Sequence, residues 1–391
     1  MAIPLLRDFD IQGKCVLVRE DLNVPVADGR VANGARIEAA LPTVRHCMAE
    51  GARVVLVSHL GRPRPGERDP ALSLGPVAKA LGDALGRAVK LVDDWQDGVD
   101  VGTSDVLLLE NIRFEAGEMT NDPALAQRLA GLCDVFVMDA FGTAHRTHAS
   151  TVGVAEAARA ACAGPLLAAE LDALGRVLDN PARPLVAVVG GAKVSTKLAV
   201  LESVADVADS IIVGGGIANT FLLASGVTIG ASLAEPDQVD VAQRIMSRVE
   251  VPMPVDLMTA VAVDAGLPAR LRPRDEVGSD EMVLDVGPET ARRLADLVAN
   301  AGTVLWNGPL GVFEMDQFGE GTRVLAEAIA SADAYSVAGG GDTLAAIEKY
   351  GVAEGMSYRS TGGGAFLEYL AGETLPGVDV LERRTVASNR Q

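Results

Sequence analysis

The hydrophobic positions of the chain form short continuous runs and do not alternate with polar ones. Eight runs rich in Val, Ile and Leu stand out at residues 15–21, 53–59, 105–111, 134–140, 185–191, 210–216, 303–309 and 334–340, with a weaker ninth at 254–260. Strands buried on both faces have this pattern, and such strands belong to parallel sheets covered by helices. Segments of helical periodicity separate the runs, so the pattern predicts one parallel α/β sheet in each half of the chain.

A single helix is predicted between the two halves. The segment 164–184 starts with Gly164-Pro165, carries apolar residues at helical spacing through Leu178, and stops at Asn180-Pro181. We interpret it as a helix that links two domains; a crossover helix within one large sheet is the alternative. A chain of 391 residues is too long for one ordinary hydrophobic core, which favours two domains.

The composition is that of a globular protein with few aromatic side chains. Hydrophobic residues make up 49 %, charged residues 22 % and aromatic residues 4 %. No stretch reaches the 18 apolar residues of a membrane span, and acidic residues come early, so we expect no signal peptide and a cytoplasmic protein. The four cysteines form no C-x-x-C pair, and we expect reduced thiols. His145 and His148 are the only close histidine pair, which chance spacing explains better than zinc.

The net charge of −19 argues against a nucleic acid or an anionic membrane as the partner. The few cations therefore carry information, and in the first half they follow the predicted strands. The first run ends at Asp21 and is followed by Asn23 and Arg36, and the second ends at His59 and is followed by Leu60, Gly61 and Arg62. Arg113 follows the third run, and His145, Arg146 and His148 follow the fourth. One such arginine is usually a solvated loop residue. Four strands that deliver such groups to one sheet edge predict a site for a small polyanion, which arginine binds in a bidentate way.

In the second half the predicted strands end in glycines. These are Gly190, Gly191, the Gly214–Gly216 triplet, Gly308, and Gly339, Gly340 and Gly341. Glycine lets backbone N–H groups approach a ligand, and a following helix N-terminus favours an anion. Lys193 and Lys197 are four residues apart and share one face if a helix begins at Lys193. The Walker pattern and a complete G-x-G-x-x-G are absent, and a tight turn without a ligand is the alternative for any one cluster. The recurrence of glycine clusters at successive strand ends predicts a nucleotide-phosphate site.

Asp342 is the one acidic residue within a glycine loop at a predicted strand end. A carboxylate beside phosphate is unfavourable unless a cation lies between them, and Mg²⁺ held by one carboxylate and substrate phosphates is the usual solution. An N-cap for a helix that starts near Thr343 is the alternative role. A polyanion site and a nucleotide site on different domains suggest phosphoryl transfer across a cleft, which needs positioning and charge neutralisation more than a nucleophilic side chain.

The chain resembles the phosphoglycerate kinase family over essentially its whole length. Eleven segments carry the resemblance, in family order: VREDLNVP (18–25), RIEAALPT (36–43), SHLGRP (58–63), LENIRF (109–114), DAFGTAHRTHAST (139–151), GGAKVSTK (190–197), GGGIANTFL (214–222), LDVGPET (284–290), WNGPLGVFE (306–314), GGGDT (339–343) and STGGGAFLE (360–368). The resemblance implies a glycolytic enzyme that reversibly transfers the acyl phosphate of 1,3-bisphosphoglycerate to MgADP, giving 3-phosphoglycerate and MgATP.

The resemblance also implies the site residues. The substrate-binding set is Asp21, Asn23, Arg36, His59, Leu60, Gly61, Arg62, Arg113 and Arg146. The nucleotide-binding set is Gly191, Ala192, Lys193, Lys197, Asn307, Gly308, Pro309, Glu314, Gly340, Gly341, Asp342 and Thr343, with Asp342 at the Mg²⁺. Arg36 and Lys193 match the residues that stabilise charge on the phosphoryl group in flight, and are the expected catalytic pair.

The implied fold is bilobal: two Rossmann-like, three-layer α/β domains with parallel sheets, a linker helix and a central cleft that closes by hinge bending. We expect an N-terminal phosphoglycerate-binding domain at 1–165 plus about 372–391, the linker helix at 166–182, and a nucleotide-binding domain at 183–371, in a monomer. The segment 375–384 is expected to return to the first domain.

Two positions depart from the family pattern. Glu20 stands where an apolar or small residue is expected, and its charge is expected to face away from the site. Tyr358 stands where many relatives have a histidine that contacts a glutamate, here Glu170; a tyrosine can donate a hydrogen bond there but forms no pH-dependent ion pair.

Two rival functions are less consistent with the sequence. An NAD-dependent dehydrogenase would carry a complete dinucleotide fingerprint. A non-catalytic anion-binding or nucleotide-binding protein of the same fold would be expected to lack Lys193, Arg36 or Asp342, and all three are present.

Overall fold

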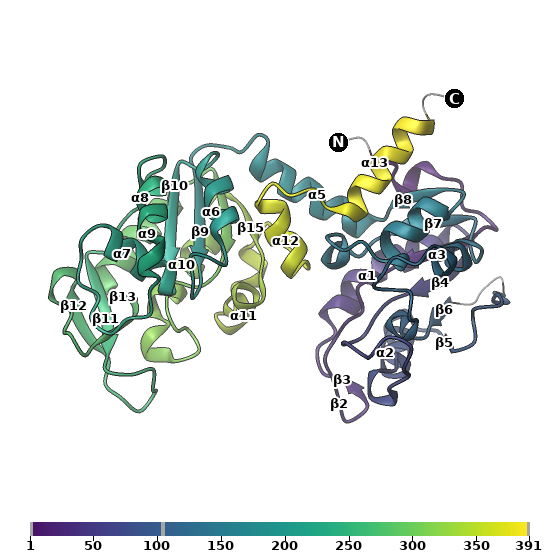
Figure 1. Ribbon diagram of the computed structural model, residues 1–391, viewed down its shortest axis with the longest axis horizontal. Helices are drawn as coiled ribbons and strands as arrows, with labels where there is room; N and C mark the ends of the chain where they lie inside the picture. Colours follow the sequence, from purple (N-terminus) through teal and green to yellow (C-terminus); the bar gives the residue numbers. More distant parts are fainter. Residues whose placement is uncertain (1–2, 103–105, 389–391) are drawn as a thin grey trace. The chain divides into compact units, whose positions relative to one another are not determined.

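The computed structural model describes residues 3–102 and 106–388. The chain divides into two compact units (Figure 1): unit 1 is Met1–Asp172 with Thr374–Gln391, and unit 2 is Ala173–Glu373. The division falls within helix α5 (Pro165–Leu178), which is shorter at its C-terminal end than the predicted linker helix. No helix in the described residues is both long enough and apolar enough to cross a membrane.

Unit 1 is built on a six-stranded parallel sheet with the order β5-β6-β4-β1-β7-β8. Its strands are β1 (Cys15–Arg19), β4 (Arg53–Val57), β5 (Val89–Val92), β6 (Val106–Leu109), β7 (Val135–Met138) and β8 (Ala161–Ala163). Its helices are α1 (Ala35–Ala49), α2 (Gly75–Leu85), α3 (Pro123–Ala130), α4 (Val154–Ala157) and α13 (Pro376–Ser388), together with the start of α5; β2 (Val26–Ala27) and β3 (Arg30–Val31) form a small hairpin.

Both faces of the unit 1 sheet are covered, as its continuous apolar strands predict. Val16 and Val54 pack in one core with Val44 of α1 and Val77 of α2. The alternate side chains, such as Leu17, are equally buried and belong to the opposite face. The unit is therefore a three-layer α/β structure.

Unit 2 has a five-stranded parallel sheet with the order β10-β9-β14-β15-β16. These strands are β9 (Leu185–Gly190), β10 (Ser210–Gly214), β14 (Thr303–Asn307), β15 (Tyr335–Ala338) and β16 (Tyr358–Arg359). The helices are α6 (Leu198–Ala205), α7 (Gly215–Ala224), α8 (Val239–Met246), α9 (Pro288–Ala299), α10 (Glu320–Ser331), α11 (Gly341–Lys349) and α12 (Gly363–Leu370). A second, antiparallel sheet has the order β12-β11-β13: β11 (Asp256–Ala260), β12 (Arg270–Pro273) and β13 (Met282–Val286).

All eight strong runs contain a strand, and each strand stops before its run does. The run 53–59 contains β4, which ends at Val57, so His59 already belongs to the loop. The weaker run 254–260 contains β11, which lies in the antiparallel sheet and alternates buried and half-buried positions. The short strands β5, β8 and β16 were not predicted, because they lie at sheet edges and carry little periodic signal.

The two ends of unit 1 are fixed by specific hydrogen bonds. Asp139, just after β7, accepts a hydrogen bond from Leu167 N in the first turn of α5 at 2.9 Å. The C-terminal helix α13 packs on unit 1: Gly377 N donates to Ala144 O at 2.8 Å, and the Arg384 guanidinium donates to Ala158 O at 2.8 Å. The N–H groups of Leu167 in the first turn of α5 and of Gly377 in the first turn of α13 thereby have acceptors.

Candidate active site

At the carboxyl edge of the unit 1 sheet, the loop after β1 holds Arg36 from the start of α1. Its Nη1 donates to Asn23 O at 2.6 Å and lies 3.4 Å from Asp21 Oδ1. The Arg36 side chain is 35 % exposed, so its remaining donors can reach a ligand. Asn23 Oδ1 accepts a hydrogen bond from Gly61 N at 2.9 Å, which joins the loop after β1 to the loop after β4. Contacts between these loops thus fix Asp21, Asn23, Arg36 and Gly61 in one place.

The loop after β6 is attached to the same place. The Asn111 side-chain amide accepts a hydrogen bond from Leu60 N at 3.2 Å and donates one to Leu60 O at 2.7 Å, as the backbone of a neighbouring strand would. Arg113 donates from Nη1 to Gly61 O, while its Nε is buried without a hydrogen-bond partner among the described residues. A buried donor without a partner costs free energy of folding unless a ligand atom accepts its hydrogen bond.

The cations at this edge influence one another strongly. Burial first, and then the neighbouring charges of Arg146, Arg19 and Arg62, lower the pKa of Arg113 to about 10, against the opposing charge of Glu118. Arg62 is exposed, and Arg146 donates from Nε to His145 Nε2 at 3.1 Å. Positive side chains gathered against their mutual repulsion in a protein of net charge −19 define an anion site. Every predicted substrate-site residue of unit 1 lies at this sheet edge.

A buried polar network lies beneath the anion site and was not predicted. Arg19 is 1 % exposed; its Nε donates to Ser150 Oγ at 3.0 Å, and its Nη2 lies 3.2 Å from His59 Nδ1. Ser150 lies in a single π-helical turn (Ala149–Gly153) and donates from Oγ to Glu118 Oε1 at 2.6 Å. A charged residue inside the apolar run 15–21 is the sequence signal that could have identified Arg19.

Glu20 is buried, at 1 % exposure, and one of its carboxyl oxygens has no hydrogen-bond partner among the described residues. Burial raises the pKa of Glu20 well above its ordinary value, and the neighbouring charge of Asp139 adds to the rise. A raised pKa favours the neutral acid. Glu20 therefore places a buried carboxyl group beside Asp139, at a position where the family pattern has an apolar or small residue.

In unit 2, Lys197 reaches the point where β9 and β14 end. Its Nζ donates to Gly190 O at 2.5 Å, Asn307 Oδ1 at 2.6 Å and Asn307 O at 3.1 Å. Burial lowers the pKa of Lys197 to about 8, which the negative charge of Asp342 partly opposes. Lys197 and Asp342, which are far apart in sequence, therefore lie near each other.

The glycines at these strand ends are required by close backbone approach. A Cβ on Gly190 would collide with Pro309 O, and one on Gly308 would collide with Gly190 O. Gly308 also has φ +112°, which other residues rarely adopt. Gly308 N donates to Thr343 Oγ1 at 2.7 Å, which ties the loop after β14 to α11. The predicted glycine loops after β9, β14 and β15 are thus adjacent.

The condition under which Lys193 and Lys197 would share a helix face is not met. Helix α6 begins at Leu198, and Lys197 directly precedes it. Lys193 lies in the turn before, with Ala192, and both are exposed; its carbonyl accepts from Thr196 Oγ1 at 2.8 Å. The two lysines therefore differ, with Lys197 drawn into the sheet edge and Lys193 in solvent. The hydroxyls and glycines before Leu198 favour turns over a helix start.

The N-cap role considered for Asp342 is wrong. Helix α11 begins at Gly341, and the residue before it is Gly340 with φ +97°, so Asp342 lies inside the first turn with its carboxylate exposed. Glu314 lies in an exposed turn, and no hydrogen bond among the described residues joins it to Lys197, Asn307 or Thr343. Within the described residues, no group of three or more His, Cys, Asp or Glu side chains could hold a metal by itself.

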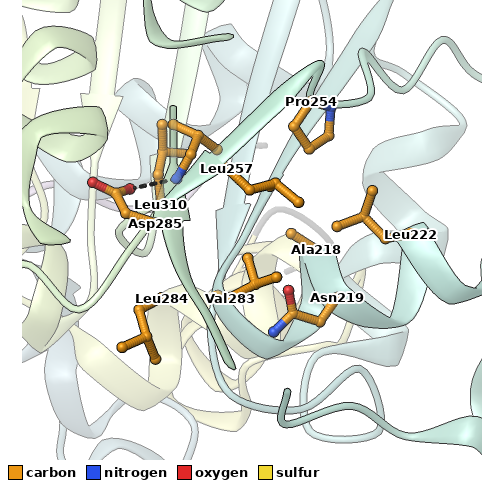
Figure 2. A pocket seen from close by; sticks show the side chains of 11 residues that line it. Ala218, Asn219, Leu222, Pro254, Leu257, Val283, Leu284, Asp285 and Leu310 are labelled. Carbon is orange, nitrogen blue, oxygen red and sulfur yellow. Dashed lines mark hydrogen bonds between the residues drawn. The ribbon is translucent and has the colours of Figure 1, made fainter. Parts of the chain in front are cut away.

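A narrow apolar hollow, partly open to solvent and with room for about one water molecule, lies beside the glycine loops and was not predicted. Figure 2 shows its walls: Ala218, Asn219 and Leu222 from α7, and Leu257, Val283 and Leu284 from β11 and β13. Gly215, also in its lining, lies against Gly191 so closely that a Cβ would be 2.7 Å from Gly191 O. Asn219 is 3 % exposed and its Oδ1 has no partner among the described residues.

An arginine-rich anion site and a glycine-lysine site with an adjoining apolar hollow, each at the carboxyl edge of a parallel sheet, are the parts of a phosphotransferase for a small acidic acceptor. The sequence model of the family "Phosphoglycerate kinase" matches residues 6–373. The solved phosphoglycerate kinase of Coxiella burnetii is 49 % identical, with a TM-score of 0.94 over 98 % of this chain and 100 % of that one. That of Pyrococcus horikoshii OT3 is 33 % identical, with a TM-score of 0.83 over 97 % and 98 %. The chain belongs to the phosphoglycerate kinase family, and its function is that of this family in glycolysis.

Proposed function

We propose that the chain transfers the acyl phosphate of 1,3-bisphosphoglycerate to MgADP at the two sheet edges described above, and that it runs the reverse reaction with 3-phosphoglycerate and MgATP. The observation that carries the proposal is the arginine cluster of unit 1. Arg36, Arg62, Arg113 and Arg146 surround one sheet edge of an otherwise acidic chain. A molecule with a phosphate at one end and a carboxylate at the other offers a partner for several guanidinium groups at once.

In the substrate site, the donors of Arg62, Arg113 and Arg146 would hold the phosphate that is not transferred. Arg36, placed by Asp21 and Asn23, would lie at the reacting carboxyl end. His59, Leu60 and Gly61 would line the same loop through side-chain and backbone donors. An ionised carboxylate is already a nucleophile, so the transfer needs no general base.

In the nucleotide site, Lys197 and the N-terminus of α11 would hold the phosphates, with Gly191, Ala192, Gly340, Gly341 and Thr343 supplying close backbone and hydroxyl donors. Asn307, Gly308 and Pro309 would form the floor, and Glu314 would lie at the rim.

The residues at this site fit Mg²⁺. Asp342 is an exposed carboxylate in the first turn of α11. One carboxylate with nucleotide phosphates is the usual way in which proteins hold Mg²⁺. When bound, the ion supplies positive charge that neutralises the phosphates.

For catalysis, Arg36 from unit 1 and Lys193 from unit 2 would neutralise charge that develops on the phosphoryl group during in-line transfer. Lys193 is exposed and free of ion pairs among the described residues, so it is available to follow that group. The ligands bind to different units, and transfer requires an arrangement of the units in which the two ligands meet and water is excluded. We propose hinge bending as the movement that creates this arrangement.

The remaining expectations complete the proposal. Residues 1–165 with about 372–391 would act as the phosphoglycerate-binding domain, 166–182 as the linker and 183–371 as the nucleotide-binding domain. The enzyme would work as a cytoplasmic monomer, with 3-phosphoglycerate or 1,3-bisphosphoglycerate and ADP or ATP as its partners, and with neither nucleic acid nor membrane.

Calorimetric titration of the two ligands tests the assignment of the sites. Arg62 and Asp342 are both exposed, so truncation of either leaves the core intact. Arg62→Ala should weaken 3-phosphoglycerate binding about tenfold or more while MgADP binding stays within about twofold, and Asp342→Ala should do the opposite. Each variant is the control for the other. Equal weakening of both ligands by either variant would contradict the assignment.

A further inference from the structure

The guanidinium of Arg19 is held by acceptors on three different segments. Its Nε donates to Ser150 Oγ at 3.0 Å, its Nη1 donates to the Glu20 carbonyl, and its Nη2 lies 3.2 Å from His59 Nδ1. A guanidinium group has donors and no acceptor. In the contact with His59, therefore, Nδ1 must be the acceptor and carries no hydrogen.

The surroundings of His59 also oppose a positive charge on its ring. The side chain is 3 % exposed, and four arginines face it: Arg19 from β1, Arg113 from the 3-10 turn after β6, Arg146 from the loop after β7, and Arg36 from α1. Burial first, and then these four charges, lower the pKa of His59 well below its usual value. With a neutral ring and an unprotonated Nδ1, the single hydrogen lies on Nε2.

We propose that Arg19 is a positioning residue that holds His59 as the neutral Nε2–H tautomer, so that His59 enters the substrate site as an uncharged hydrogen-bond donor. The inference rests on the proposed function, in which His59 contacts the anionic acceptor. It adds a division of labour: the arginines supply the charge of the site, and His59 supplies a directed donor whose state does not change near neutral pH.

A second layer keeps Arg19 in this orientation. Ser150 donates its hydroxyl hydrogen to Glu118 Oε1 at 2.6 Å, which leaves the Ser150 oxygen to accept from Arg19. Glu118 is 1 % exposed and also accepts from Ser150 N at 2.9 Å. Burial acts to raise the pKa of Glu118, but the hydrogen bond from His148, the charge of Arg19 and the hydrogen bond from Ser150 together hold it below its ordinary value. Glu118 is thus the buried counter-charge of Arg19.

Nuclear magnetic resonance of the histidine side chains tests the tautomer directly. The chain has four histidines, so ¹⁵N-histidine labelling gives four ring patterns, and a His59→Gln sample identifies the pattern of His59. Long-range ¹H–¹⁵N correlation of the ligand-free wild type at pH 6, 7 and 8 should show a protonated Nε2 and an unprotonated Nδ1 at all three values. A protonated Nδ1, or a ring that becomes doubly protonated in this range, would overturn the proposal.

The role of Arg19 is tested by Arg19→Met, which removes the donor and the charge next to Nδ1. The fixed tautomer should be replaced by a mixture of both forms. If this variant does not fold, Ser150→Ala removes only the acceptor of Arg19 Nε, and the Nδ1–H form should become detectable. A variant that folds and keeps the pure Nε2–H form would show that Arg19 is not the cause.

Kinetics of two substitutions separate this inference from the proposed function. A Gln amide reaches the position of Nε2, whereas the shorter Asn amide reaches that of Nδ1. KM for 3-phosphoglycerate should rise about 10–100-fold in His59→Asn, as for loss of a hydrogen bond to a charged group, and clearly less in His59→Gln. Equal large losses would contradict the Nε2 donor. An unchanged KM in both variants would contradict the substrate role of His59 itself, whatever tautomer the spectra show.

Discussion

Lys197 Nζ lies 2.6 Å from Asn307 Oδ1, so the lysine that precedes α6 is tied to the end of the neighbouring strand β14. Its other two acceptors, Gly190 O and Asn307 O, are also neutral. The ammonium group is therefore fixed in place while its charge is not neutralised by a directly bonded carboxylate. Asn307 in turn donates from Nδ2 to Gly339 O at 2.7 Å, which extends the support to the loop before α11. This relationship makes Lys197 a preorganised cation for nucleotide phosphates.

The first prediction is a pH dependence of nucleotide affinity. Burial places the pKa of Lys197 at about 8, so the free protein loses this charge as pH rises through 8. Bound phosphates favour the charged form, hence MgADP should bind about tenfold more weakly at pH 9 than at pH 7 and take up a proton on binding near pH 8. Calorimetry in buffers of different ionisation enthalpy measures both effects. Lys197→Arg, which stays charged, should flatten the profile; a wild-type profile as flat as that of the variant would contradict the role.

The second prediction concerns Arg36. Arg36→Ala should lower kcat by about 100-fold or more, as for loss of a charge-stabilising donor in the transition state, with MgADP affinity nearly unchanged. Arg45→Ala is a matched control on the same helix, since Arg45 is exposed and donates only to Ala84 O among the described residues. Steady-state kinetics of both variants gives the comparison. An unchanged kcat in Arg36→Ala would remove Arg36 from the transition state.

The third prediction concerns the glycine loop after β14. Gly308→Ala introduces a Cβ at φ +112° that collides with Gly190 O, and the backbone strain alone costs about 1–3 kcal/mol. Gly341→Ala is the matched control, because its Cβ would meet nothing within 4 Å. Urea unfolding should show a clearly lower midpoint for Gly308→Ala and a change within about 0.5 kcal/mol for Gly341→Ala. Similar stabilities for the two variants would show that the loop adapts.

The fourth prediction is a pH dependence of stability that comes from Asp285. This carboxyl group is 2 % exposed, and burial raises its pKa to about 7, above that of the unfolded chain. A raised folded-state pKa means that the unfolded chain loses the proton first, so this group makes the protein less stable as pH rises from about 4 to 7. Asp285→Asn removes the ionisation, and its free energy of unfolding relative to wild type should rise by about 3 kcal/mol between pH 5 and pH 8. A difference that is constant with pH would contradict the buried ionisation.

Eight strands of the two parallel sheets could be predicted because fully buried strands such as β1 and β9 leave continuous apolar runs, whereas the short edge strands β5, β8 and β16 could not. The runs overshot each strand by one or two residues, and those residues were the ones at the sheet edge, such as His59 and Gly191. The start of α6 could not be predicted, since spacing alone allows Lys193 and Lys197 to share a helix face. In the structure Lys197 Nζ is bound by one oxygen of Gly190, just before the turn, and by two oxygens of Asn307 on the sequence-distant β14, which spacing does not reveal.

The buried network was harder to predict because each member looks ordinary in sequence. Arg19, Ser150 and Glu118 are widely separated along the chain and carry no motif of their own. Only the position of Arg19 inside an apolar run could have indicated that its charge is buried and must be paired. The apolar hollow beside α7 left no local signal, because its walls come from β11 and β13 as well as from α7.

The central claim is that this chain makes an acyl phosphate from a carboxylate and a nucleotide. The most direct measurement mixes the protein with 3-phosphoglycerate, MgATP and hydroxylamine, and detects the hydroxamate that traps the acyl phosphate. We expect hydroxamate that requires the protein and all three reagents, and that falls with kcat in Arg36→Ala. No hydroxamate from protein that still binds 3-phosphoglycerate and MgADP in calorimetry would contradict it.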